Sequence, residues 1–176
     1  MSDHAEVLVC LSFEPPQTVA PRVLERLVEA GIVSAIPTDC TLGSSGYAPG
    51  PNVKAAVRDT SFTNLRVNGL EIELPDQVEL FGWGEGFEPS FACSSCKRAL
   101  DEGPMYGLLK AGVSAWGRVA CPACEGARPL WEWNVLEGAL GNLGFHFWNW
   151  TPLRKSFIER MEDWCEAPLT RVHVAI

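Results

Sequence analysis

Near the start of the chain, apolar residues follow patterns typical of a strand, a helix and a second strand. Residues 7–13 alternate with a period of two, and both alternating sets are mainly apolar, which predicts a buried strand. In residues 19–28 the apolar positions recur every three or four residues, which predicts a helix that Thr18 caps and Gly31 ends. Residues 32–36 then predict the second strand.

The end of the chain carries the same series of patterns. Residues 143–150 predict an aromatic strand, and Thr151 and Pro152 follow it as the cap and the first-turn proline of a helix. That helix continues to Cys165 with one apolar face, and residues 169–176 alternate as a final strand. Two strand-helix-strand units favour an α+β fold, with ferredoxin-like βαβ halves around a mixed sheet.

The stretch between the two units is less regular. Asn68 and Gly69 lie between apolar runs at residues 65–67 and 70–74, and this pair suits the two positive φ angles of a type I′ turn. A β-hairpin is therefore predicted there. Residues 37–51 are rich in Gly, Ser and Pro and predict a long irregular loop.

Four cysteines in the middle of the chain form two C-x-x-C pairs, Cys93 with Cys96 and Cys121 with Cys124. Two residues between thiols allow a tight turn to direct both sulfurs at one ion, and two such turns supply a tetrahedral four-cysteine shell suited to zinc. Gly126 follows the second pair, where the turn needs a residue that tolerates positive φ. Residues 90–130 therefore predict a zinc ribbon that holds a structural ion.

Other interpretations of the four cysteines stay open. A rubredoxin-like iron would use the same four thiolates, because ligand set and geometry alone do not distinguish zinc from iron. Thiol redox chemistry needs one C-x-x-C at the start of a helix, whereas here the pair is duplicated. Between the pairs, residues 108–110 and 113–119 predict a hairpin.

These patterns divide the chain into three parts. Residues 1–89 and 131–176 are expected to form the two parts of one α+β body, with the ribbon inserted between them. A ribbon of this size has few apolar contacts and depends on its ion for stability. The three other cysteines, Cys10, Cys40 and Cys165, are expected to stay reduced, and no disulfide is predicted.

The charge of the chain restricts its partners. The formal net charge is −8, although residues 93–128 hold five basic side chains against three acidic ones. Four thiolates and one Zn²⁺ add two negative charges, so the loaded ribbon is near neutral. Nucleic acid is held by clustered Lys and Arg, and the acidic chain argues against it as a partner. A protein or a small molecule stays open as the partner.

The sequence also indicates a location. No uncharged apolar run approaches the roughly 18 to 20 residues that span a bilayer, so no membrane partner is expected. Residues 1–6 are acidic and lack the basic segment of a secretory signal. The predicted location is the cytoplasm.

The loop at residues 37–51 is a second place where chemistry could occur. It holds Asp39, Cys40 and Tyr47 after a predicted strand, and long loops of this kind are often functional. A nucleophilic Cys40 would need a base, for which His146 in the aromatic strand is the inward candidate, with Trp148 beside it. These five residues form a candidate ligand-binding site. Neither Cys40 nor His146 has a recognisable catalytic motif around it, so no enzyme activity is assigned.

The tryptophans gather near the return from the ribbon to the body. The chain has seven of them, including Trp131, Trp133, Trp148 and Trp150. We expect these four to pack the ribbon onto the sheet, and a surface that stacks on a ligand or anchors a partner is the alternative.

Three stretches resemble a known group of proteins. They are Pro-Thr-Asp-Cys-Thr-Leu-Gly at 37–43, Asn-Gly-Leu-Glu-Ile at 68–72 and Gly-Asn-Leu-Gly-Phe-His-Phe-Trp-Asn-Trp-Thr-Pro-Leu at 141–153. With the paired C-x-x-C, they resemble an uncharacterised family of short bacterial proteins, some of which are labelled sugar ABC transporter ATPase. The resemblance implies no activity or site. The label does not fit this chain, which has no G-x-x-x-x-G-K-[ST] motif to hold the triphosphate of ATP.

The sequence supports three hypotheses of function. The leading one is a cytoplasmic zinc-binding adaptor or binding protein, in which the structural ribbon holds an interaction surface against the body. The second is an enzyme or ligand binder that uses the 37–51 loop and the strand of His146. The third, nucleic-acid binding through the ribbon, requires Lys97, Arg98, Arg118 and Arg128 to converge on one face.

Overall fold

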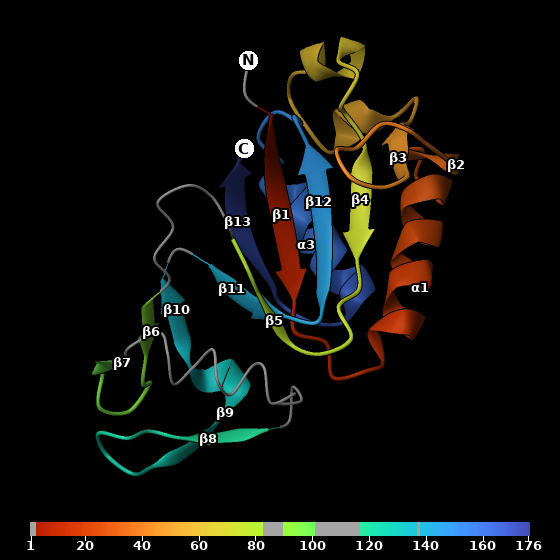
Figure 1. Cartoon of the computed structure of the whole chain (residues 1–176). Helices are drawn as coiled ribbons and strands as arrows, with labels where there is room; N and C mark the ends of the chain where they lie inside the picture. Colours follow the sequence, from red (N-terminus) through yellow and green to blue (C-terminus); the bar gives the residue numbers. More distant parts are fainter. Residues whose placement is uncertain (1–2, 83–89, 101–116, 137) are drawn as a thin grey trace.

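The computed structural model of the chain describes residues 3–82, 90–100, 117–136 and 138–176. This described part contains a six-stranded sheet, two α-helices and a smaller unit of short strands (Figure 1). The six strands lie in the order β13, β1, β12, β4, β3, β2. Their bounds are β1 (His4–Cys10), β2 (Val33–Thr38), β3 (Gly46–Pro49), β4 (Leu70–Glu73), β12 (Leu143–Trp148) and β13 (Leu169–Ala175).

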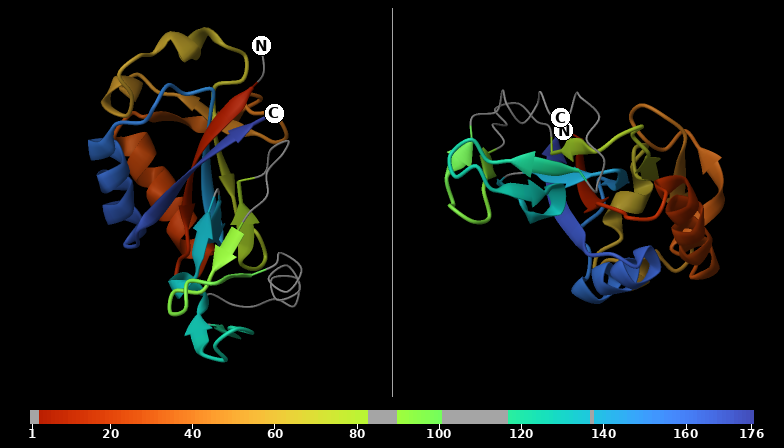
Figure 2. Two further views of the ribbon diagram at one scale, coloured as in Figure 1. Left: turned by 90° about the vertical axis from the view of Figure 1, so that its left-hand side faces the viewer. Right: turned by 90° about the horizontal axis from the view of Figure 1, so that it is seen from below.

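Both predicted strand-helix-strand units lie in this one sheet. The first consists of β1, α1 (Pro16–Glu29) and β2, and the second of β12, α3 (Lys155–Cys165) and β13. Strand β1 lies between β12 and β13 and pairs with both. The two helices lie on the same side of the sheet (Figure 2), and the α+β class is confirmed.

The expected mixed sheet is wrong for the described strands, because every pairing among them is antiparallel. Strands β12 and β13 run in the same direction, but β1 separates them and hydrogen-bonds to each from the opposite direction. A crossover unit produces parallel pairing only where its two strands are neighbours. The strand order prevents that in both units.

The main core lies between the sheet and the helices. Alternate residues of a strand point to the same face, so Leu8 of β1 and Phe145 and Phe147 of β12 all reach this side and are fully buried. The helices cover these side chains with one apolar face each. The buried helix residues are Val19, Ala20, Val23 and Leu27 of α1 and Phe157, Met161 and Cys165 of α3.

Helix α1 begins earlier than its apolar pattern indicated. It starts at Pro16 with Pro15 at the N-cap, so Thr18 lies inside the helix and does not cap it. Proline suits the first position of a helix, here that of Pro16, because its φ is already helical and an N–H at that position would have no partner within the helix. At the other end Gly31 has a φ of 68°, which confirms that it ends the helix.

Helix α3 begins three residues after the predicted start. Arg154 occupies its N-cap position, and the hydroxyl of Thr151 donates to the carbonyl oxygen of Asp59 instead. No helix in the described part of the chain is long and apolar enough to span a bilayer.

The predicted hairpin at Asn68 and Gly69 does not form. Neither residue has a positive φ, and both donate their backbone N–H groups to the carbonyl oxygen of Cys40. Strand β4, which follows them, pairs with β12 and β3. Strand β3 lies within the stretch predicted to be an irregular loop, so that prediction is corrected as well.

The smaller unit begins against the large sheet, where Phe81 and Ala139 share an apolar cluster with Ala5, Val7 and Val9 of β1, and it extends beyond one end of that sheet (Figure 1). Its strands are β5 (Glu79–Phe81), β6 (Ser90–Ala92), β7 (Ala99–Leu100), β8 (Arg118–Ala120), β9 (Ala127–Pro129), β10 (Asn134–Leu136) and β11 (Ala139–Gly141). Strand β6 pairs with β7 and β10, β8 with β9, and β5 with β11. The hairpin predicted for residues 108–110 and 113–119 lies mainly outside the described residues. The division at residues 90 and 130 stays a prediction.

Strand β5 connects the two parts through Phe81, whose ring lies directly on Gly144 of β12. We expect Gly144→Ala to destabilise the body by about 1 to 3 kcal/mol, because a methyl group there overlaps ring carbons and forces the core to rearrange. Urea unfolding followed by circular dichroism measures the effect. Gly43→Ala is the control, since a Cβ at Gly43 meets no atom within 4 Å. Equal stability of the two variants would contradict the contact.

Candidate metal centre

The first cysteine pair lies in the turn between β6 and β7. The backbone N–H of Lys97 donates to the carbonyl oxygen of Cys93 at 2.9 Å, and the N–H of Cys93 donates to that of Arg98 at 3.1 Å. Lys97 has a φ of 59°, in the left-handed region. These two bonds close a tight turn that directs the sulfurs of Cys93 and Cys96 to the same side.

The second pair repeats this geometry between β8 and β9. The N–H of Glu125 donates to the carbonyl oxygen of Cys121 at 2.7 Å, and the N–H of Cys121 donates to that of Gly126 at 3.1 Å. Glu125 has a φ of 58°. The sequence placed the positive φ at Gly126, which is wrong by one residue. The left-handed residue is the one that directly follows the second cysteine in both turns.

The two turns bring all four sulfurs together. The ligand atoms of Cys93, Cys96, Cys121 and Cys124 lie within 4.8 Å of one another. The Sγ atoms of Cys93 and Cys124 are 3.9 Å apart, and those of Cys96 and Cys121 are 3.8 Å apart. A tetrahedral ion with bonds of about 2.3 Å to sulfur separates its ligands by about 3.8 Å. The arrangement is consistent with a zinc site, and the separations are far longer than a disulfide bond of about 2.05 Å.

Each pair has one inner and one outer sulfur. Cys93 and Cys121 are fully buried, whereas Cys96 and Cys124 are exposed. The inner cysteines belong to a second apolar cluster, whose other buried members are Val78, Leu80, Phe91, Val119 and Trp133. The site therefore lies at the surface of the small unit with its inner wall against an apolar core.

The electrostatics of the four thiols favour a cation. Hydrogen bonds from the backbone N–H groups of Cys96 and Ser95 lower the pKa of Cys93 to about 6. At Cys124 the N–H of Gly126 also favours the thiolate, but desolvation and the neighbouring cysteines outweigh it and raise the pKa to about 11. Four negative sulfurs this close together repel one another, so they need a metal ion to be thiolates at the same time.

The candidate residues of the 37–51 loop lie apart from one another. The Asp39 carboxylate is exposed and pairs with Arg66, Oδ2 to Nη2, at 3.3 Å. Cys40 is buried, and its sulfur lies against Gly69. Tyr47 of β3 packs against the helix-side core. These contacts leave the three side chains in separate environments.

His146 and Trp148 lie together in β12, with ring centroids 6.2 Å apart. Nε2 of His146 lies 2.7 Å from Oε2 of Glu73, and Nε1 of Trp148 donates to Oε2 of Glu71 at 2.8 Å. Oε1 of Glu71 also accepts a hydrogen bond from Ser44 Oγ at 2.7 Å. Among the described residues, no hydrogen bond or ion pair joins His146 to Asp39 or Cys40.

The glutamates beside His146 were not identified from the sequence. Glu71 and Glu73 are two positions apart in a strand, so their side chains share a face, and this spacing was the available signal. The sequence did not identify their partner strand, because residues 74–142 lie between β4 and β12 in the chain.

The basic residues of the ribbon are partly engaged. Arg128 reaches across to the first turn, where its Nε donates to Ser95 Oγ at 2.7 Å. Arg118 donates from Nη2 to the carbonyl oxygen of Ala127 at 2.7 Å. Both arginines therefore contribute to holding the turns, while Lys97 and Arg98 are exposed.

Comparison with known proteins gave no relative of this chain. No protein-family model matches it, and neither a curated protein nor a solved structure does. The function is therefore argued from the geometry of the site.

We expect Glu125→Gly to stabilise the metal-loaded unit by about 1 kcal/mol, because a side chain in the left-handed region costs about that much and glycine removes the cost. Glu125→Val should destabilise it, since a branched side chain suits that region least. The rate at which a chelator removes the ion measures both effects. Ala123→Gly, in the same turn but outside the left-handed region, is the control and should lose stability, because glycine gives the unfolded chain more conformational freedom.

Metal affinity should rise with pH. Cys124, with a pKa of about 11, holds its proton at neutral pH, so metal binding must displace that proton. Affinity should therefore rise about tenfold per pH unit from this group at neutral and mildly alkaline pH. Below the pKa of Cys93, about 6, the proton of this thiol competes as well, and affinity should fall more steeply. Competition with a coloured chelator across this range measures it, and an affinity independent of pH would contradict the assignment.

Proposed function

We propose that this protein is a cytoplasmic zinc-binding adaptor or binding protein, in which one structural ion holds a zinc ribbon at the end of an α+β body of ferredoxin-like type. The observation that carries the proposal is the approach of four sulfurs to one another at tetrahedral spacing. Four protein ligands fill the coordination sphere of zinc and leave no position for a substrate, which is the arrangement of structural sites. Catalytic zinc keeps one position open.

The strand order supports the ferredoxin-like part of the proposal. In a split βαβ arrangement, a strand of one unit lies between the two strands of the other. Here β1 lies between β12 and β13, and both helices lie on one side of the sheet. The resemblance to short bacterial zinc-ribbon proteins agrees with this proposal and adds no activity to it.

The binding role is favoured over the enzyme by the positions of the loop residues. A nucleophile and its base must lie within hydrogen-bond reach. Cys40 is buried against Gly69, while His146 faces Glu73. Nothing in these contacts activates the thiol, so the ribbon is the better supported site. The partner class that suits a near-neutral ribbon on an acidic body is a protein or a small molecule.

Two measurements test the proposal: the metal content of the purified protein and the effect of replacing one cysteine ligand. We expect the purified protein to be colourless with one zinc per chain, and Cys121→Ser to unfold the region around residues 93–128 while the body keeps its fold. Zinc in small peptides contributes on the order of 10 to 16 kcal/mol at pH 7, which two short hairpins cannot replace. Metal analysis and amide hydrogen exchange measure these outcomes, and Cys10→Ser, outside the cluster, is the control that should retain the ion.

Cobalt substitution separates a structural from a catalytic site. The visible spectrum of the tetrahedral cobalt form should not change on addition of azide or cyanide, because no coordination position is open. A shifted spectrum would show an exchangeable ligand and favour the enzyme. A red protein containing iron would replace zinc and point to electron transfer.

A further inference from the structure

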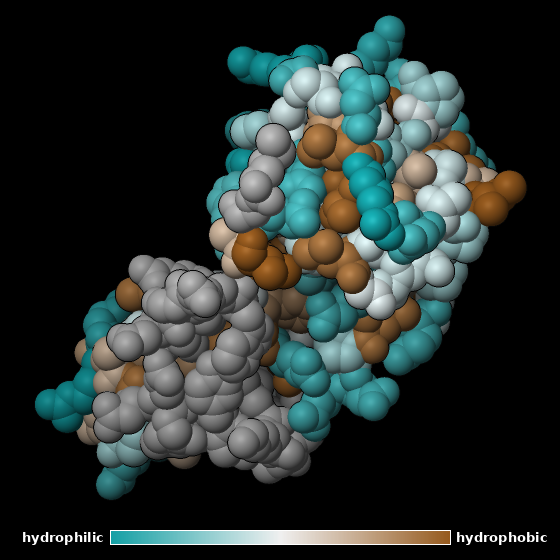
Figure 3. Space-filling view, turned by 45° about the horizontal axis from the view of Figure 1, so that its top comes forward, coloured by the Kyte–Doolittle hydropathy of each residue, from teal (hydrophilic) through white to brown (hydrophobic). Residues whose placement is uncertain are grey.

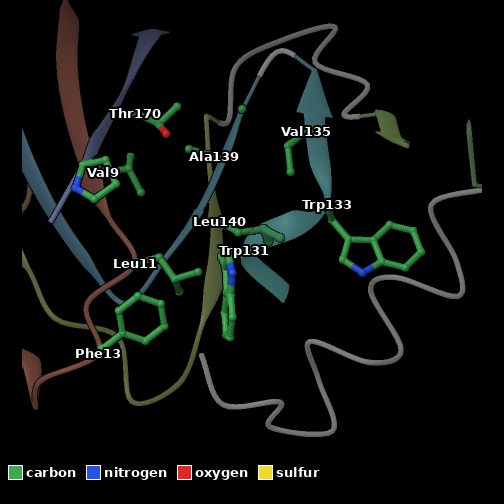
Figure 4. Close-up of a pocket in the computed structure, with 11 residues that line it drawn as sticks. Val9, Leu11, Phe13, Trp131, Trp133, Val135, Ala139, Leu140 and Thr170 are labelled. Carbon is green, nitrogen blue, oxygen red and sulfur yellow. The ribbon is translucent and has the colours of Figure 1, made fainter. Parts of the chain in front are cut away.

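A pocket of about 330 Å³ lies where the small unit meets the body. Its lining residues belong to β1 and the segment after it, to β10 and the segment before it, to β11, and to the start of β13 (Figure 4). Pockets that bind small molecules have volumes of roughly 300 to 1,000 Å³ and occur preferentially where two structural units meet. This pocket is at the small end of that range.

Aromatic side chains form one end of the pocket. The rings of Phe13 and Trp131 meet edge to face, with centroids 5.1 Å apart and an interplanar angle of 85°. Figure 4 shows this pair at one end of the pocket and Thr170 at the other. Leu11 and Leu140 lie between them. Such walls suit a flat apolar molecule that can stack on or against the rings.

The polar side-chain groups of the pocket are few and uncharged. None of its eleven lining residues carries a charge, and the hydroxyl of Thr170 is the one side-chain oxygen among them. An ionic ligand would lose its hydration here without gaining an opposite charge, which is costly. The lining therefore favours an uncharged molecule with at most one or two hydrogen-bonding groups.

Figure 3 shows another part of the surface. On the face of the body that is visible there, hydrophobic residues are interspersed with hydrophilic ones.

One wall of the pocket is shared with the metal centre. Trp133 lines the pocket and belongs to the apolar cluster that buries Cys93 and Cys121. Leu11, Val135 and Leu140, which also line it, pack against the same cluster. Loss of the ion would loosen the cysteine turns and with them this wall.

We propose that this pocket is a binding site for a small, uncharged aromatic molecule, and that the bound metal ion holds one of its walls in place. The second part rests on the proposed function, because it requires the ribbon to be metal-dependent. The pocket is separate from the strand of His146, which the sequence favoured as a ligand site.

The probe is N-phenyl-1-naphthylamine, an uncharged aromatic molecule that fluoresces when it leaves water. The full metal-loaded protein should bind it saturably at one site. Its sulfonated relative, 1-anilinonaphthalene-8-sulfonate, has an added sulfonate group with one negative charge and should bind at least tenfold more weakly. Equal binding of the two molecules, or no saturable binding of the uncharged one, would overturn the proposal.

Two variants that add the same side chain at different positions test where on the protein the probe binds. Thr170→Trp fills the pocket from an exposed position of β13 and should weaken binding of the uncharged probe at least tenfold. His173→Trp adds the same side chain at an exposed position of the same strand that does not line the pocket, and should bind as the wild type does. Undiminished binding by Thr170→Trp would overturn the site. As a second readout on the wild type, the indole N–H resonances of Trp131 and Trp133 should shift with the probe, while that of Trp150, buried in the helix-side core, should not.

Metal content, measured on the same samples, separates the two proposals. Removal of the ion by a chelator should abolish probe binding while the circular dichroism of the body persists. Unchanged binding after removal would overturn the role of the ion in the pocket. A protein that is purified without metal and still binds the probe in the manner described would overturn the proposed function and leave the pocket standing.

Discussion

The four sulfurs of the small unit repel one another as thiolates, and the stability of the unit depends on removing that repulsion. Its hairpins have strands of two or three residues, and isolated hairpins of that size are not stable in water. Their turns nevertheless place four ionisable thiols within 4.8 Å of one another. The pKa of Cys93 is lowered and that of Cys124 is raised, as expected where neighbouring thiolates repel one another. A divalent cation removes the repulsion and joins the two hairpins at the same time.

The effect of the ion extends towards the body through apolar contacts. The inner sulfurs lie in the cluster of Phe91, Val119 and Trp133, and Leu11, just beyond β1, packs against that cluster. A second connection runs through β5 and β11, where Phe81 lies on Gly144 of the large sheet. The pocket lies between these two connections. Its shape is therefore a consequence of how the small unit is held, rather than of any one strand.

The body has its own buried polar anchor. Glu6 of β1 is 2% exposed, and its carboxylate contacts the Arg171 guanidinium of β13 and accepts a hydrogen bond from the N–H of Leu153 at 3.2 Å. A buried carboxylate requires such partners, because desolvation without them is costly. The contacts link β1 to one of its neighbours, β13, and to the segment before α3. They agree with β1 being the strand around which the two units meet.

The sequence by itself determined the features that depend on neighbouring residues. The C-x-x-C spacing defines a turn of about six residues, so the four ligands could be predicted without the fold. The positive φ was predicted at Gly126, whereas the structure has it at Glu125. Periodicity likewise predicted both strand-helix-strand units. Only the tertiary structure decided which strands pair, that Cys40 receives the hydrogen bonds of Asn68 and Gly69, and that distant aromatic residues line one pocket. Those outcomes depend on contacts between residues far apart in the chain, and local patterns do not record such partners.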